Sequence, residues 1–214
     1  MKRIQGWLLG VGIVGGVMLG AGNYRDAWLW LYWIAFAATT GYALSAIDDE
    51  LARERFSPPS RGADALSLRI IRIIALAHVL VGAADSRFGW THVTDALRAV
   101  GIAGFVACFL FMIAAMKANR FFSPVVRIQD ERGHRVVDAG PYAIIRHPGY
   151  AAMIPLMAFS ALALGSWIAF AIALVYAGLI LRRVAFEDGF LRRHLAGYEA
   201  YTSRVRYRLL PGIW

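Results

Sequence analysis

Long apolar runs alternate with shorter polar stretches along the chain. Apolar residues fill six segments, and runs of this kind are typical of helices that cross a membrane. The six segments are Trp7–Gly22, Ala27–Ile47, Leu68–Ala84, Ala96–Met116, Tyr150–Leu164 and Trp167–Leu181. The pattern therefore predicts an all-α integral membrane protein with about six membrane helices.

The last two apolar segments are shorter than a full membrane span. Each holds roughly 15 residues, which reach ~22 Å at 1.5 Å per residue, against a hydrocarbon core of ~30 Å. Only Gly165 and Ser166 separate the two segments. The sequence therefore predicts a short C-terminal helical hairpin whose ends emerge on one side of the membrane. The polar stretches 117–148 and 182–214 then meet on that side.

Positive charges are distributed unevenly between the predicted loops. If the N-terminus lies inside, the outer loops hold only Arg25 and Arg87, and Arg72 and Arg98 fall within predicted spans. All other Lys and Arg residues then lie in the inner segments. Because Lys and Arg concentrate in cytoplasmic loops, we expect both termini to be cytoplasmic.

Composition narrows the class of protein further. The chain is 59% hydrophobic and 17% charged, whereas soluble domains are about half apolar and about a quarter charged. Its single cysteine, Cys108, excludes an intrachain disulfide, and its apolar neighbours indicate a buried thiol. The net charge is +9, but no nucleic-acid-binding signature accompanies it. Membrane lipids, and no nucleic acid, are therefore the expected partners of the basic residues.

Two further features predict local structure. Gly12, Gly16 and Gly20 recur every four residues, so they should share one helix face and admit another helix closely. This face would permit a helix dimer, but the oligomeric state stays open. The stretch 48–69 mixes charges of both signs and contains Pro58 and Pro59, which is typical of a solvated connector.

The stretch 135–150, RVVDAGPYAIIRHPGY, is a candidate for chemistry. Pro148 follows Arg146 and His147, so both are presented on irregular backbone just before a helix whose first turn accepts the proline. Amides at such a helix start favour an anion, for example a carboxylate. The alternative is a polar entry loop in which Arg146 reaches lipid headgroups.

A second candidate is the acidic pair Glu187 and Asp188 at the end of the last apolar segment. Charges at a membrane edge are costly unless they are paired or functional. Arg183 precedes Glu187 by four residues, a spacing that permits a helical ion pair. The pair could bind the amine or hydroxyl groups of a ligand, or act as a base. The alternative is a surface ion pair on an amphipathic helix, followed by tyrosines and arginines at headgroup depth.

Histidines give little support for a metal site. No His pair has metal-ligand spacing, and only a convergence of His134, His147 and Glu187 in space would supply ligands. We therefore expect no metal. His78, on an apolar segment, is expected to be a hydrogen-bonded packing residue.

Taken together, these elements resemble the isoprenylcysteine carboxyl methyltransferase family, which is related to the phospholipid N-methyltransferases. The resemblance covers about residues 117–214, and the run NRFFSPVVRIQDERGHRVVDAGPY is similar to bacterial members. The matching residues are Gly140, Pro141, Tyr142, Arg146, His147, Pro148, Tyr150, Glu187, Asp188, Leu191, Tyr198, Tyr201 and Pro211. This likeness implies a location in a bacterial inner membrane.

The resemblance also implies an activity: S-adenosylmethionine-dependent methylation of a lipophilic substrate at the cytosolic face. Residues 1–116 would form an N-terminal four-helix membrane region and residues 117–214 the catalytic region, within one structural domain. Arg183 and Glu187 are the expected catalytic residues. The expected cofactor-binding residues are Gly140, Pro141, Tyr142, Arg146, His147, Pro148, Tyr150, Glu187, Asp188 and Tyr198. The methyl acceptor, a carboxylate, thiol or amine of an isoprenoid or lipid, stays open, and a non-catalytic membrane scaffold is the alternative.

Overall fold

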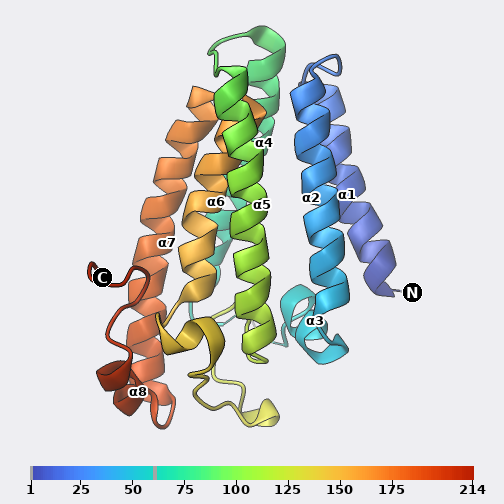
Figure 1. The fold of residues 1–214 in the computed structure, drawn as a ribbon. Coiled ribbons are helices and arrows are strands. Elements are labelled where there is room, and N and C mark those ends of the chain that lie inside the picture. Colours follow the sequence, from blue (N-terminus) through green and yellow to red (C-terminus); the bar gives the residue numbers. More distant parts are fainter. Residues whose placement is uncertain (1, 60–61) are drawn as a thin grey trace.

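The computed structural model describes residues 2–59 and 62–214, which form a bundle of long helices with short helices and loops at one end (Figure 1). Within these residues every regular element is helical, which confirms the all-α fold. The long helices are α1 (Lys2–Ala21), α2 (Ala27–Ala46), α4 (Ala65–Phe88), α5 (Asp95–Ala118), α6 (Pro148–Leu164) and α7 (Trp167–His194). The short elements are α3 (Asp49–Phe56), η1 (Asp130–Arg132), η2 (Gly140–Ala143) and α8 (Tyr198–Arg204).

Six long helices occur where six apolar segments were predicted, but they differ in length and hydropathy. Among the described residues, α4, α5 and α7 are long and apolar enough to cross a membrane, while α6 and the stretch Ile4–Met18 are shorter apolar helices. The chain therefore has the helices of an all-α membrane protein.

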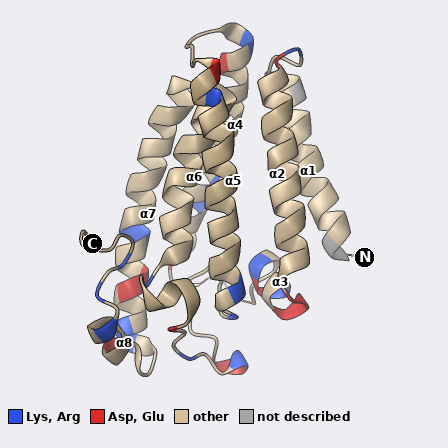
Figure 2. Cartoon of the chain, in the orientation of Figure 1, with Lys and Arg blue, Asp and Glu red and all other residues tan. Residues whose placement is uncertain are grey.

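Charged residues gather at the end of the bundle that carries α3, α8 and the long loop between α5 and α6 (Figure 2). We call this the polar end. The opposite end, with the α1–α2 and α4–α5 connections, carries few charges (Figure 2). The segments predicted to be on the inner side thus share one end. Arg61, which belongs to these segments, lies outside the described residues.

The C-terminal hairpin differs from the prediction in its second arm. The turn is as tight as expected: Gly165 ends α6 with φ +80°, and the side chain of Ser166 accepts a hydrogen bond from the amide of Ala169. However, α7 continues unbroken to His194 rather than ending at Leu181. Glu187 and Asp188 therefore sit on a rigid helix, because the polar residues continue the helix that the apolar residues began.

Close helix packing occurs at different glycines from those predicted. A Cβ atom at Gly101 on α5 would lie 2.8 Å from the carbonyl oxygen of Phe159 on α6, so only glycine allows this approach. At Gly12, Gly16 and Gly20 a Cβ atom would meet nothing within 4 Å. Within this chain the predicted packing of that glycine face is therefore wrong.

The described residues of the stretch 48–69, which are 48–59 and 62–69, fold against the polar end, so the prediction of a solvated connector is wrong. Asp48 caps α3 by accepting a hydrogen bond from the amide of Leu51, which is buried. Glu54 on α3 is also buried, with its side chain 2.7 Å from Nη2 of Arg127 in the α5–α6 loop. This ion pair attaches α3 to the loop.

His78 is a packing residue, as predicted. Its Nδ1 lies 3.1 Å from the carbonyl oxygen of Ala169, and its Nε2 lies 2.9 Å from the hydroxyl of Ser160. The Ser160 hydroxyl is also 2.8 Å from the hydroxyl of Tyr32. A fully buried chain of hydrogen bonds thus joins α2, α4, α6 and α7 in the middle of the bundle.

Candidate functional site

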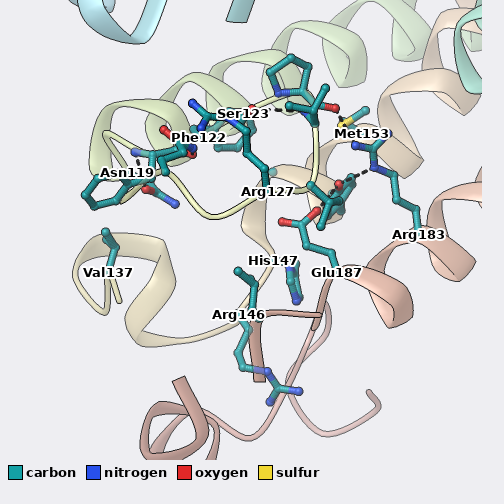
Figure 3. A pocket seen from close by; sticks show the side chains of 18 of the residues that line it. Asn119, Phe122, Ser123, Arg127, Val137, Arg146, His147, Met153, Arg183 and Glu187 are labelled. Atoms are coloured by element: carbon teal, nitrogen blue, oxygen red, sulfur yellow. Dashed lines mark hydrogen bonds between the residues drawn. The ribbon is translucent and has the colours of Figure 1, made fainter. Parts of the chain in front are cut away.

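A cavity of about 350 Å³ opens at the polar end, between α3, α4, the α5–α6 loop, α6, α7 and the C-terminal tail (Figure 3). Its walls differ in character. One wall is apolar and is built by α4, α6 and α7, from Leu68, Ile71, Ala75, Met153, Tyr176 and Ile180. The other is polar and includes Asn119, Arg127, His147, Glu187 and Tyr198. Ligand pockets of this size and mixed lining are common in proteins.

The carboxylate of Asp188 is fully buried on the side of the polar wall that faces away from the cavity, and several polar side chains bind to it. Its oxygens accept hydrogen bonds from Nε and Nη2 of Arg146 at 2.8 and 3.1 Å, and from Nε of Arg208 at 3.0 Å. The hydroxyl of Tyr198 donates to it at 3.1 Å, and Nε2 of His147 lies 3.2 Å away. Asp188 therefore holds the α5–α6 loop, α8 and the tail against α7, but it does not line the cavity.

The guanidinium of Arg146 takes part in the hydrogen bonds around Asp188. Besides Asp188, its Nη1 donates to the carbonyl oxygens of Val205 and Arg206 at 2.8 and 2.6 Å. Burial opposes its charge, but the hydrogen bond and charge of Asp188 raise the pKa of Arg146 above its usual value. Figure 3 shows its side chain pointing away from the centre of the cavity. The arrangement favours a role in holding the wall together.

His147 and Tyr198 present polar groups to the cavity. The ring of His147 is buried, and its Nε2 lies 3.2 Å from Oδ1 of Asp188 and 3.4 Å from the hydroxyl of Tyr198. Its Nδ1 has no hydrogen-bond partner within the described residues. Burial and the nearby charges of Asp188 and Glu187 raise the pKa of the Tyr198 hydroxyl well above its usual value, so it stays protonated.

Glu187 is connected to Arg183 through Tyr150. The hydroxyl of Tyr150 donates to Oε2 of Glu187 at 2.6 Å and accepts from Nε of Arg183 at 2.8 Å. The direct Arg183–Glu187 ion pair that the spacing permits is therefore absent from the described contacts, since the tyrosine hydroxyl lies between the two. The second carboxylate oxygen of Glu187, Oε1, is free to bind a ligand in the cavity.

Arg183 is fixed by groups from three other segments. Its Nη2 donates to the carbonyl oxygen of Pro124 at 2.6 Å and lies 3.0 Å from Oδ2 of Asp64, an ion pair that does not meet hydrogen-bond geometry. Its side chain is only 4% exposed. The guanidinium therefore holds Tyr150, and through it Glu187, in a defined position.

The α5–α6 loop closes the cavity opposite α7. Arg127 pairs with Glu54 at 2.7 Å and with Glu131 at 2.6 Å, and its side chain lies across the cavity from Glu187 (Figure 3). Nδ1 of His134 accepts a hydrogen bond from the amide of Gln129 at 3.3 Å. Burial, aided by the charge of Arg127, lowers the pKa of His134 to about 4, so its ring is neutral at physiological pH.

The predicted site residues fall into two groups. Tyr142, Arg146, His147, Tyr150, Arg183, Glu187 and Tyr198 line the cavity, whereas Gly140, Pro141, Pro148 and Asp188 do not. Gly140 adopts φ +58° and begins η2 together with Pro141, and Pro148 is the buried first residue of α6. These residues set the path of the loop that carries the lining side chains.

The loop amides also have partners other than a ligand. The backbone N–H groups of Arg146 and His147 donate to the carbonyl oxygens of Tyr207 and Arg208, both at 2.9 Å. The hydroxyl of Tyr201 donates to the carbonyl oxygen of Tyr142 at 2.7 Å. The tail therefore occupies the amides of Arg146 and His147, which precede the first turn of α6.

Several lining residues were not singled out from the sequence. Arg55 on α3 and Arg72 on α4 line the cavity, as does Asn119 after α5. Arg72 breaks an apolar run, which was a usable signal of function. Arg55 lies in a mixed-charge stretch that gave no such signal. Within the described residues no group of three or more His, Cys, Asp or Glu side chains is placed to hold a metal.

The fold and the cavity together define an all-helical membrane protein with a half-polar, half-apolar binding cavity at its charged end. Comparison with known proteins narrows this class. Residues 99–193 match the model of the isoprenylcysteine carboxyl methyltransferase family, so this part of the chain is similar to that family. The match begins within α5 and ends before Tyr198, Tyr201 and Pro211, so the tail lies beyond it.

Two curated relatives support the match. Each is a probable protein-S-isoprenylcysteine O-methyltransferase of rice, one from Oryza sativa subsp. indica and one from subsp. japonica. Each is 30% identical over 95 residues, which is 44% of this chain and 50% of the relative. The chain thus spans about half the length of the curated relatives it matches.

Proposed function

We propose that the protein is a membrane methyltransferase that uses S-adenosylmethionine to methylate a lipophilic substrate at the cytosolic face. The observation that carries this proposal is that one cavity has both a polar and an apolar wall. A polar cofactor and an apolar acceptor must meet in one water-poor site for methyl transfer, and this cavity offers a surface to each.

The polar wall fits the cofactor. Nδ1 of His147, the free oxygen of Glu187 and the Tyr198 hydroxyl present one acceptor-capable nitrogen, one anion and one neutral polar group to the same space. In this proposal these groups bind its amine, carboxylate and hydroxyl groups. Gly140, Pro141, Tyr142, Arg146, Pro148 and Asp188 support them by shaping the loop. When bound, S-adenosylmethionine supplies an electrophilic methyl group on a sulfonium.

The chain's own contribution is mainly positioning. Holding an acceptor in line with a reactive methyl group gives large rate gains without further chemistry. Arg183 and Tyr150 fix Glu187 in the polar wall of the cavity. A carboxylate acceptor needs no base, whereas an amine or thiol acceptor would deliver its proton to Glu187. The apolar wall excludes water and receives the hydrocarbon part of the substrate.

Calorimetric titration of the detergent-purified protein with S-adenosylhomocysteine tests the cofactor site. We expect micromolar binding that is weakened at least tenfold in Glu187→Gln and in His147→Ala. Glu199→Gln, which removes an exposed carboxylate on α8, is the matched control and should bind like the wild type. Wild-type binding that survives both site substitutions would overturn the residue assignments.

The alternative is a membrane scaffold that keeps the fold without catalysis. The free, cavity-facing groups of His147 and Glu187 favour the enzyme, because a scaffold has no use for unpaired polar groups at a membrane edge. Absence of binding both in detergent and in lipid nanodiscs would favour the scaffold.

A further inference from the structure

The cavity has an excess of positive charge on the side formed by α3 and α4. Among the described residues that line it, the charged side chains other than histidine are Arg55, Arg72, Arg127, Arg135, Arg146, Arg183 and Glu187. Three of these arginines already have partners: Arg127 pairs with Glu54, Arg146 with Asp188 and Arg183 with Asp64. Arg135 belongs to the loop wall. This leaves Arg55 and Arg72 on the side of the cavity that the α5–α6 loop does not form.

Arg55 and Arg72 form no ion pair with any described residue. Arg55 is half-buried, and its guanidinium lies 5.2 Å from the ring centre of Phe122, a contact that stabilises a cation without neutralising it. Burial, together with the charges of Arg72 and Arg183, lowers the pKa of Arg55 below its usual value. Arg72 is exposed at the cavity edge. A desolvated charge without a counter-charge is costly, so the site is incomplete without an anion.

The apolar wall adjoins one of these arginines, Arg72, on the same helix, α4. Leu68, Arg72 and Ala75 recur at intervals of four and three residues, and such positions share one face of a helix. All three line the cavity, and so does the neighbouring Ile71. An occupant that lies along α4 therefore meets a positive charge and an apolar surface within about one helical turn.

We propose that Arg55 and Arg72 form a recognition site for the acidic head of an amphiphile, whose apolar chain lies along the wall formed by α4, α6 and α7. The acid-binding site itself does not depend on the proposed function. Only the identification of the bound amphiphile as the methyl acceptor rests on that function. Both arginines lie outside residues 99–193, so this part of the site is a feature of the N-terminal half of this chain. An amine head would be repelled here.

Binding of four ligands with the same alkenyl chain tests this site in non-ionic detergent, without cofactor. The ligands are oleate, oleyl phosphate, oleyl alcohol and oleylamine. We expect the two acids to bind at least tenfold more tightly than the alcohol, and the amine more weakly still. Comparing oleate with oleyl phosphate separates a carboxylate head from a phosphate head.

Substitutions locate the charge effect. Arg55→Gln and Arg72→Gln should each weaken acid binding by ~10- to 100-fold, the range of a charge-assisted hydrogen bond, and leave alcohol binding unchanged. Arg69→Gln, on the same helix but outside the cavity lining, should bind acids like the wild type. Arg72→Glu should reverse the preference in favour of the amine.

Equal affinity for the acids and the alcohol, or unchanged acid binding in both glutamine variants, would overturn the proposal. Titration of the same variants with S-adenosylhomocysteine keeps this result separate from the proposed function. Acid binding that depends on Arg55 and Arg72 in a protein that fails to bind S-adenosylhomocysteine would retain the acid site and reject the methyltransferase.

Discussion

Replacing Asp188 with asparagine should destabilise the protein strongly, whereas replacing the adjacent Glu187 with glutamine should not. Asp188 is fully buried and faces the guanidinium groups of Arg146 and Arg208, together with His147 and Tyr198. Glu187 accepts one hydrogen bond, from Tyr150, and otherwise faces the cavity. Two neighbouring acids are thus predicted to differ in what they do.

The size of the effect follows from burial. The Arg146 and Asp188 side chains are 3% and 0% exposed, and breaking a buried pair by removing one partner costs on the order of 3–5 kcal/mol, because a charge is left uncompensated. The Asp138–Arg204 pair provides the contrast, with side chains 48% and 67% exposed, and such surface pairs contribute about 0–1 kcal/mol. Glu187→Gln keeps an acceptor for Tyr150 and should cost about 1 kcal/mol.

Unfolding in mixed micelles, followed by tryptophan fluorescence, measures these differences. We expect Asp188→Asn to lose ~3–5 kcal/mol of unfolding free energy, with Asp138→Asn and Glu187→Gln close to the wild type. Stability and ligand binding should separate in Glu187→Gln. This variant should remain folded but bind S-adenosylhomocysteine poorly. A loss below ~1 kcal/mol in Asp188→Asn would refute the reasoning, because it would mean that Arg146 and Arg208 find other partners at no cost.

Three further predictions concern other parts of the structure. Tyr150→Phe removes the hydroxyl between Arg183 and Glu187, so it should cost ~1–3 kcal/mol in unfolding assays and weaken S-adenosylhomocysteine binding; full affinity would contradict the link. Burial lowers the pKa of His134 to about 4 in the folded protein, from 6.5 in an unfolded chain. The unfolded chain therefore takes up the proton first, and stability should fall between pH 6.5 and 4, by at most ~3 kcal/mol. This slope should flatten in His134→Phe, and an identical slope would refute the assignment. Gly101→Ala should lower the free energy of unfolding by ~1–3 kcal/mol, because the added methyl group forces α5 away from α6. Gly12→Ala should unfold at the same temperature as the wild type or higher. Equal effects of the two substitutions in thermal unfolding would argue against the observed helix packing.

The sequence was sufficient to predict what depends on local pattern. Hydrophobic runs located six long helices, and the Gly165–Ser166 turn marked the hairpin, because helix formation and tight turns depend on nearby residues. The RHP element and the acidic pair of α7 were also correctly placed next to each other. What the pattern could not supply was the direction of each side chain, since that depends on packing between distant segments.

The errors have the same physical origin. The α3 segment looked like a solvated connector because its charges are visible in the sequence, while their partners, such as Arg127, lie far along the chain. The Arg183–Glu187 spacing permitted an ion pair, but Tyr150 from α6 enters between the two side chains. The glycine spacing of α1 was regular, yet contact occurs at Gly15, where a Cβ atom would lie 2.8 Å from Nε1 of Trp33.

The geometry of α7 explains why two adjacent acids serve different purposes. Successive residues on a helix point about 100° apart, so a helix that forms a cavity wall directs one member of the pair into the cavity and the other behind it. Glu187 shares the cavity face with Arg183, one turn earlier, and with Leu191, one turn later. Asp188 instead faces the loop and the tail, where Arg146 and Arg208 bring segments from both sides of the hairpin onto one carboxylate. The C-terminal tail, residues 205–214, thus lies outside the family match but closes the site. It does so because Asp188 binds both Arg146 of the α5–α6 loop and Arg208 of the tail.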